Sequence, residues 1–253
     1  MHKYLLTIAY DGTAYSGWQY QPNALSIQQV LESAFQTILK RKISVVGCSR
    51  TDAGVHAYAQ KAQIILEEEI EGEKLLYCIN GVLPLDIRIK KIEKVPSDFH
   101  VRFDAKKKIY HYHIVSDLFH DPCKRGFSLH VRHRIDLDSL KKAIPYFIGT
   151  HDFKAFANQN SKGSASTCSI KTIYAINLTE ERGGYVLEFI GNGFLYKMVR
   201  NIVGTLLECA KGKLLPEKIP ELLKHQDRRL VPKAAPAHGL FLVDISYDKD
   251  NSL

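Results

Sequence analysis

The order of strand and helix patterns along the chain is the feature that most restricts its fold. A strand-like start is followed by a segment from Ser26 to Leu39 in which apolar residues recur at helical spacing. Strands come next, and the second half then runs through helix, strands, helix and a final strand. This order predicts an α+β protein in which two halves share one sheet.

The expected elements can be placed individually. On 109–115, alternation puts Tyr110 and Tyr112 on one face of a strand, opposite two histidines. The polar stretch His151–Lys171 predicts a loop. No sharp linker separates the halves. The weakest seam lies near 103–108, so the expected halves are 1–104 and 105–253. Strands are expected at 56–66, 87–95, 109–115, 172–178, 185–190 and 240–247, and helices at 26–39, 74–80, 137–147, 194–210 and 216–225.

The composition points to a cytoplasmic protein. No apolar run approaches the roughly 20 residues of a membrane span, and the strand-like N-terminus leaves no room for a signal peptide. The five cysteines are widely spread without a CxxC pair, which favours reduced thiols.

The charge favours a polyanionic partner. The 253 residues carry a net charge of +8, and cationic surfaces attract phosphate backbones. A solvated face explains any single basic run, but the set predicts a discontinuous RNA footprint. The runs are Lys106–Lys108, Lys124-Arg125, Arg132-His133-Arg134 and Arg228-Arg229.

One short segment carries the strongest chemical signal. Residues 47–57 read GCSRTDAGVHA and follow a β-branched run. They hold a single carboxylate, Asp52, two residues after Arg50 and between glycines that allow sharp turns. An ordinary aspartate turn between strands is the alternative interpretation.

This segment resembles the catalytic motif of TruA-type tRNA pseudouridine synthases. Four further segments resemble the same family in the same order, so the likeness covers nearly the whole chain. They are 10–22, 99–112, 194–204 and 235–242. The resemblance implies a pseudouridine synthase fold, with a mixed, mostly antiparallel sheet flanked by helices. It also implies tRNA as partner, a homodimer, no cofactor and no metal.

The resemblance assigns roles to three catalytic candidates. The reaction breaks the N1–C1′ bond of a uridine, turns the base and rejoins it through C5, and Asp52 stands at the position of the nucleophile. Arg200, inside an apolar helix, is the expected ion-pair partner of Asp52, although an arginine can also extend to solvent. Tyr110 matches a tyrosine that stacks on the base, whereas we interpret Tyr112 as packing.

The resemblance also implies substrate-binding residues. Arg50 matches the residue that helps flip the uridine out of its helix, and Leu242 matches an apolar residue of the base pocket. An RNA-contacting segment matches Phe99, His100, Val101, Arg102 and Phe103. The target would be a uridine at about positions 38–40 of the tRNA anticodon arm. The loop 158–168 lacks arginine, and Asp104 places an acid near the expected RNA path.

Other functions compete with this interpretation. Gly191-Asn192-Gly193 follows a strand and opens a helix, as in a dinucleotide fingerprint, but Tyr196 replaces the third glycine. The only Pro-Cys pair lacks the second cysteine of zinc deaminases. A non-catalytic RNA-binding protein remains the main alternative.

Overall fold

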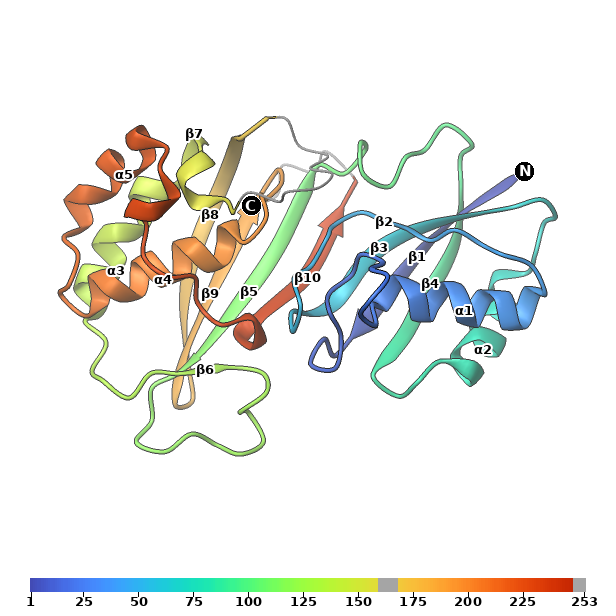
Figure 1. Cartoon of the computed structure of the whole chain (residues 1–253), viewed down its shortest axis with the longest axis horizontal. Helices are drawn as coiled ribbons and strands as arrows, with labels where there is room; N and C mark the ends of the chain where they lie inside the picture. Colours follow the sequence, from blue (N-terminus) through green and yellow to red (C-terminus); the bar gives the residue numbers. More distant parts are fainter. Residues whose placement is uncertain (159–167, 248–253) are drawn as a thin grey trace. The chain divides into compact units, whose positions relative to one another are not determined.

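The computed structural model describes residues 1–158 and 168–247. The chain divides into two compact units (Figure 1). Unit 1 is Met1–Lys106 with Phe241–Leu253, and unit 2 is Lys107–Leu240. The C-terminal strand therefore belongs to the same unit as the N-terminal residues.

Unit 1 is a sheet covered by two helices that contact each other. Its strands lie in the order β4-β1-β3-β10, and β2 pairs with β3. All these pairs are antiparallel except β10 with β3, where Phe241 lies opposite His56. The elements are β1 (His2–Tyr10), α1 (Ile27–Leu39), β2 (Val46–Gly47), β3 (His56–Leu66), α2 (Gly72–Val82), β4 (Ile87–Val95) and β10 (Leu240–Ser246).

Helix α1 forms for local reasons that the sequence already contains. The Ser26 side chain accepts a hydrogen bond from the Gln29 backbone N–H at 3.2 Å and so caps the first turn. Ile27, Leu31 and Phe35 lie on one stripe of the helix and are buried against the sheet. The predicted helix from residue 26 to 39 is therefore confirmed.

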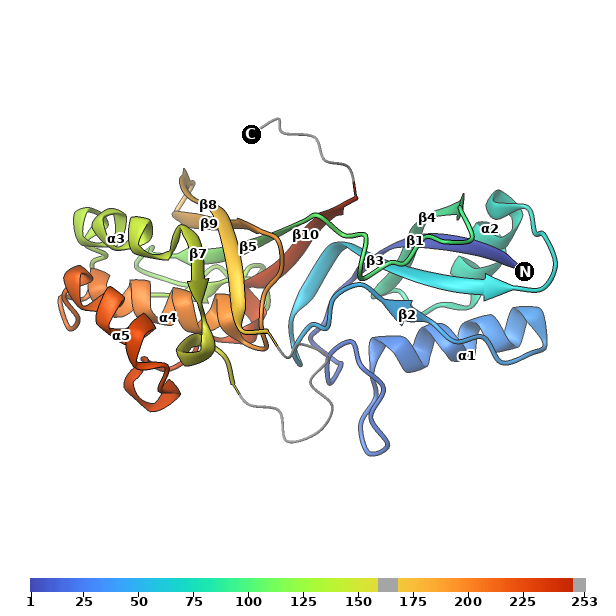
Figure 2. The same ribbon diagram turned by 90° about the horizontal axis from the view of Figure 1, so that it is seen from above.

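Unit 2 is also a sheet with helices packed on it, and its described residues form three α-helices (Figures 1 and 2). The strand order is β5-β9-β8-β7, all antiparallel, and β6 pairs with β5 in parallel. The elements are β5 (Lys107–Val115), β6 (Leu129–His130), α3 (Leu137–Ala143), β7 (Gly149–Asp152), β8 (Ile170–Glu181), β9 (Gly184–Gly191), α4 (Met198–Ala210) and α5 (Ile219–His225). Mixed, mostly antiparallel strands with helices in both units confirm the predicted α+β class.

Three expected elements differ from the structure. Helix α3 ends at Ala143 and continues as a 3₁₀ turn, because Pro145 cannot continue the α-helical hydrogen bonds. Helix α4 begins only at Met198, since Lys197 before it has a left-handed φ of 60°. The polar stretch predicted as a loop contains strand β7 and the buried Phe153. The rest of that loop, 159–167, lies outside the described residues.

Within the described part of the chain, no helix is both long and apolar enough to cross a membrane.

Candidate active site

The turn that carries Asp52 lies in unit 1, between β2 and β3. Asp52 is half-buried, whereas its neighbours Thr51 and Val55 are buried. The Val55 backbone N–H donates to the Asp52 carbonyl at 3.2 Å and closes the turn. Gly54 within it has φ +75°, a conformation that favours glycine. The backbone is thus fixed, while Asp52 as a residue stays half-buried.

Buried polar side chains hold the residues before Asp52. The hydroxyls of Tyr10 and Thr51 lie 2.8 Å apart. Gln60, on β3, donates to the Ser49 carbonyl at 2.7 Å and accepts from the Ser49 N–H at 3.2 Å. Burial raises the pKa of Tyr10, so its phenol stays neutral and can take part in this network.

Arg50 and Arg102 bring two guanidinium groups near this turn. Arg50 is exposed, and Arg102 is held by a 2.8 Å hydrogen bond from its Nε to the Gly47 carbonyl. Burial lowers the pKa of Arg102, and the charge of Arg50 lowers it further. Two like charges so close together favour an anionic ligand such as RNA phosphate.

The predicted RNA-contacting segment is anchored at its centre and open at its tip. Val101 is buried; its N–H donates to Gln63 Oε1 at 2.8 Å, and its carbonyl accepts from the Tyr247 hydroxyl at 3.0 Å. His100 and Phe103 stack at 4.1 Å, and Phe103 is 79% exposed. The exposed Phe103 ring, stacked on the half-buried His100 above a fixed backbone, is a suitable surface for an RNA base.

Phe99 and Asp104, at the two ends of that segment, have structural contacts. The ring of Phe99 packs edge-on against Tyr247 at 4.9 Å. The Asp104 carboxylate accepts from the His100 N–H at 2.8 Å, and the Asp104 N–H donates to the His100 carbonyl. The acid that the sequence places near the RNA path therefore stabilises the local turn.

Leu242, the expected pocket residue, is fully buried on β10, opposite Ala57 of β3. Its neighbour Phe241 stacks on the rings of His56 at 4.6 Å and Tyr58 at 5.0 Å. The C-terminal strand is thus joined to the strand that follows Asp52.

Tyr110 and Tyr112 lie on β5 of unit 2 and differ in their surroundings. Tyr110 is 6% exposed and packs its ring edge-on against Phe194 at 5.2 Å. Tyr112 is fully buried; its hydroxyl donates to the Pro236 carbonyl at 2.9 Å, and burial raises its pKa. Tyr112 therefore packs, as predicted.

Arg200 lies in the first turn of α4 and is half-buried. Its Nε donates to the Ala235 carbonyl at 2.8 Å, and its own carbonyl accepts from the Ala235 N–H at 2.9 Å. Backbone and side chain are both held by residue 235, so the guanidinium is oriented before any ligand binds. The pairing of Arg200 with Asp52 stays a prediction.

Several supporting residues were not identified from the sequence. Tyr10, Gln60 and Gln63 come from β1 and β3, and each reaches a site segment through a buried hydrogen bond. The available signal was weak: Gln60 and Gln63 are polar residues inside an otherwise strand-like run. Only the strand register shows what they contact.

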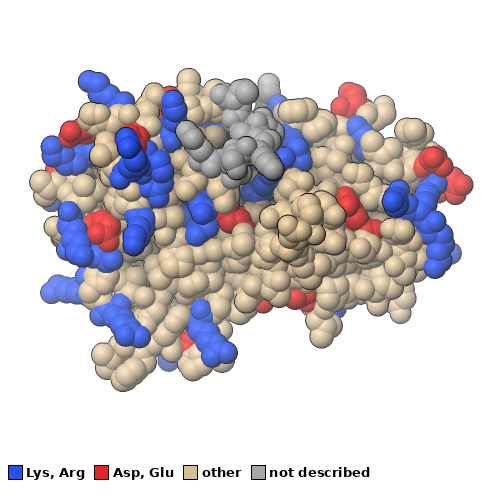
Figure 3. Space-filling view, in the orientation of Figure 1, with Lys and Arg blue, Asp and Glu red and all other residues tan. Residues whose placement is uncertain are grey.

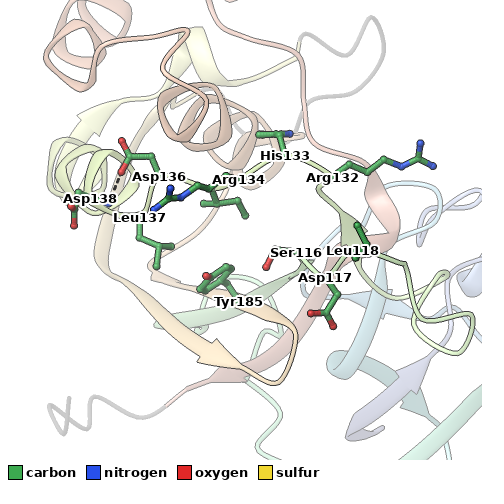
Figure 4. A pocket seen from close by; sticks show the side chains of 11 residues that line it. Ser116, Asp117, Leu118, Arg132, His133, Arg134, Asp136, Leu137, Asp138 and Tyr185 are labelled. Atoms are coloured by element: carbon green, nitrogen blue, oxygen red, sulfur yellow. Dashed lines mark hydrogen bonds between the residues drawn. The ribbon is translucent and has the colours of Figure 1, made fainter.

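Unit 2 also holds a cavity of about 760 Å³ that contains none of the predicted catalytic residues (Figure 4). It is formed by residues 116–118 and 132–138 together with Tyr185. Arg132 and Arg134, from one predicted basic run, extend in opposite directions there. The Asp136 carboxylate caps α3 by accepting from the N–H groups of Asp138 and Ser139.

The geometry bears on one rival function. Strand β9, which precedes Gly191-Asn192-Gly193, is antiparallel to both neighbours, whereas dinucleotide sites require a parallel βαβ unit. Among the residues that the structure describes, no three histidines, cysteines or acids are grouped to hold a metal ion.

Comparison with known proteins shows which family the chain belongs to. The chain matches the family model described as tRNA pseudouridine synthase over residues 6–104 and 143–248. It is 47% identical over 252 residues to tRNA pseudouridine synthase A 1 of Protochlamydia amoebophila. That alignment covers 99% of this chain and 98% of the relative.

Two further relatives agree. Identity is 42% over 247 residues to tRNA pseudouridine synthase A of Acetivibrio thermocellus, covering 98% of this chain and 100% of the relative. Identity is 45% over 248 residues to tRNA pseudouridine synthase A of Chlamydia muridarum, and the alignment covers 97% of this chain and 92% of the relative. The chain belongs to the TruA family of tRNA pseudouridine synthases, which are isomerases. The predicted resemblance is confirmed.

Proposed function

We propose that the protein converts uridine to pseudouridine in the tRNA anticodon stem-loop, at about positions 38–40, with Asp52 as nucleophile. The N1–C1′ bond breaks, the base turns and a C5–C1′ bond forms. C5 then loses its proton and N1 gains one, so the composition of the nucleotide is unchanged. The observation that carries this proposal is the Asp52 turn. The turn is held by hydrogen bonds of its own backbone and of Tyr10 with Thr51, while Asp52 as a residue is half-buried.

Two residues of unit 2 complete the proposed chemistry. Arg200 pairs with Asp52, keeps the carboxylate ionised in a site that excludes water, and orients it. The hydrogen bonds between Arg200 and Ala235 support this role, since they restrict the guanidinium. Tyr110 stacks on the flipped base, and its phenol takes part in proton transfer.

The remaining candidates bind the RNA. Arg50 enters the space left by the flipped uridine and holds the adjoining phosphate, which agrees with its exposure next to Arg102. Residues 99–103 contact the RNA strand, and Leu242 lines the base pocket. The basic runs of unit 2 contact phosphates further away.

A position-resolved assay tests the chemistry and the target together. Unmodified tRNA transcripts are incubated with wild-type protein and with Asp52→Ala, and carbodiimide adducts are mapped as reverse-transcription stops. We expect Asp52-dependent stops in the anticodon arm. Stops elsewhere would retain the nucleophile and replace the target. Binding without any Asp52-dependent stop would favour a non-catalytic RNA-binding protein.

We further propose that the protein acts as a cytoplasmic homodimer. Leu118 and Phe119 of unit 2 are 83% and 80% exposed, and neighbouring apolar side chains of this kind are commonly buried between subunits. Light scattering of the purified protein should give twice the 28.7 kDa chain mass. A single-chain mass across micromolar concentrations would contradict the dimer.

A further inference from the structure

Residues 10–18, which we call the N-terminal clamp, enclose the Asp52 turn from one side. The Trp18 N–H donates to the Thr51 carbonyl at 3.1 Å, and the Gly54 N–H donates to the Tyr15 carbonyl at 3.3 Å. Gly12 lies so close to the turn that a Cβ atom there would be 2.0 Å from the Val55 carbonyl oxygen. The clamp therefore contacts the turn on both sides of Asp52.

Asp11, near the start of the clamp, forms a polar pair with His56 at the far end of the Asp52 turn. Asp11 Oδ1 lies 3.1 Å from His56 Nδ1, and the same carboxylate oxygen accepts from the N–H and hydroxyl of Thr13. The Gly12 backbone nitrogen lies 3.1 Å from the same Nδ1, which accepts from the Gly12 N–H when it carries no proton and donates to Asp11 when it carries one. Burial opposes ionisation of Asp11, but the hydrogen bonds from Thr13 and the nearby His56 lower its pKa overall. The carboxylate is therefore charged at neutral pH.

Packing alone does not explain a histidine at this position. His56 is 1% exposed and stacked on Phe241, a place that an apolar side chain would fill without the cost of burying an imidazole. His56 is four residues after Asp52 and closes the turn that begins at Thr51. Its Nδ1 contacts Gly12 and Asp11 of the clamp, so it links the clamp to the far end of the turn.

We propose that Asp11 and His56 are positioning residues for Asp52. Through Nδ1, which accepts from the Gly12 N–H when it carries no proton and donates to the Asp11 carboxylate when it carries one, His56 fixes the C-terminal end of the turn. Tyr10 fixes the N-terminal end through Thr51. The pair touches no reacting atom in this role; it sets where the nucleophile stands. A displacement of about 1 Å at a nucleophile can cost about a hundredfold in rate. This inference rests on the proposed role of Asp52.

The test is single-turnover pseudouridine formation on an anticodon-arm tRNA substrate, measured with RNA affinity. We expect His56→Leu, which can pack on Phe241 but lacks the Nδ1 contacts, to lower the rate constant 10- to 100-fold with affinity within twofold. His56→Asn, whose amide can replace Nδ1, should recover part of the rate. Asp11→Asn should lower the rate about tenfold.

The coupling between the two residues is the sharper readout. Because they act through one contact, the double variant with Asp11→Asn and His56→Leu should be no slower than His56→Leu alone. The matched control is Tyr4→Phe, which removes partly buried hydrogen bonds to residue 70 on another part of unit 1. It should leave the rate unchanged.

Each contrary outcome has a distinct meaning. If Asp52→Ala is inactive but the Asp11 and His56 variants react at the wild-type rate, the positioning role is wrong and the nucleophile stands. If His56→Leu and His56→Asn lower the rate constant equally, and if that loss parallels their loss of thermal stability, the pair is merely structural. If Asp52→Ala remains active, the proposed function itself fails.

Discussion

The two units differ in charge and in how they hold their functional residues. Residues 107–240 contain 21 lysines and arginines against 12 aspartates and glutamates, a net charge of +9, whereas the rest of the chain contains 14 against 15, a net charge of −1. Figure 3 shows basic side chains spread over unit 2, with few acidic ones between them. Unit 1 instead surrounds Asp52 with short buried hydrogen bonds.

This difference indicates a division of labour. Precise placement of a nucleophile requires a rigid, well-packed surrounding, while RNA affinity depends mainly on the number of phosphate contacts. Variants of Asp52 in unit 1 and of the basic runs in unit 2 should therefore separate the reaction rate from RNA affinity.

The largest effect is expected at Asp52. Asp52→Ala should lower turnover by about four orders of magnitude or more, because it removes the covalent route. RNA affinity should stay within about tenfold of wild type, since phosphate contacts carry most of it. Filter binding and single-turnover kinetics on the same preparation measure both. A parallel loss of affinity and rate would break the proposed division.

The two tyrosines of β5 give a comparison within unit 2. Tyr110→Phe should reduce the rate constant about 100-fold by removing a proton-transfer group, with little change in stability. Tyr112→Phe should leave the rate unchanged but lower the free energy of unfolding by about 1–2 kcal/mol, because the Pro236 carbonyl loses its donor. Urea denaturation and kinetics separate the two. Reversed effects would exchange their roles.

Arg50 offers an intermediate effect within unit 1. Arg50→Ala should slow single-turnover reaction by about tenfold, because flipping the uridine out of its stack costs a few kcal/mol. A substrate whose target uridine is mismatched flips more easily and should recover most of the lost rate. Equal slowing on matched and mismatched RNA would assign Arg50 a role other than flipping.

The smallest effect tests the charge of unit 2. Replacing Arg132 and Arg134 by glutamine should weaken tRNA binding about fivefold and reduce the slope of log affinity against log salt by about one to two. The matched control replaces the exposed Lys90 and Lys91 of unit 1 by glutamine. Identical slopes for both double variants would show that the charge difference between the units has no part in binding.

Local signals in the sequence were sufficient for much of the fold. The cap at Ser26 and the apolar stripe of α1 lie in one continuous segment, so the helix can be predicted from them. The start of α4 could not, because it depends on a left-handed lysine at 197, a conformation that a non-glycine residue seldom signals. Strand β7 has only four residues and depends on pairing with β8.

The site divides in the same way. A motif in consecutive residues is enough to select Asp52 and Arg50. Their supports come from distant segments: Tyr10 from β1, Gln60 from β3 and Phe241 from the end of the chain. Only tertiary register brings these side chains to the turn, so their contacts could not be predicted from local sequence patterns.

The pairing of β10 with β3 also has a consequence for synthesis on the ribosome. The edge of β3 at His56 and Ala57 is paired with Phe241 and Leu242, which are translated after the whole of unit 2. While the intervening 134 residues of unit 2 emerge, the nascent N-terminal part has an incomplete sheet with an open strand edge. Truncation before residue 241 would therefore remove the ring that stacks on His56, and unit 1 can complete its sheet only after translation has passed through unit 2.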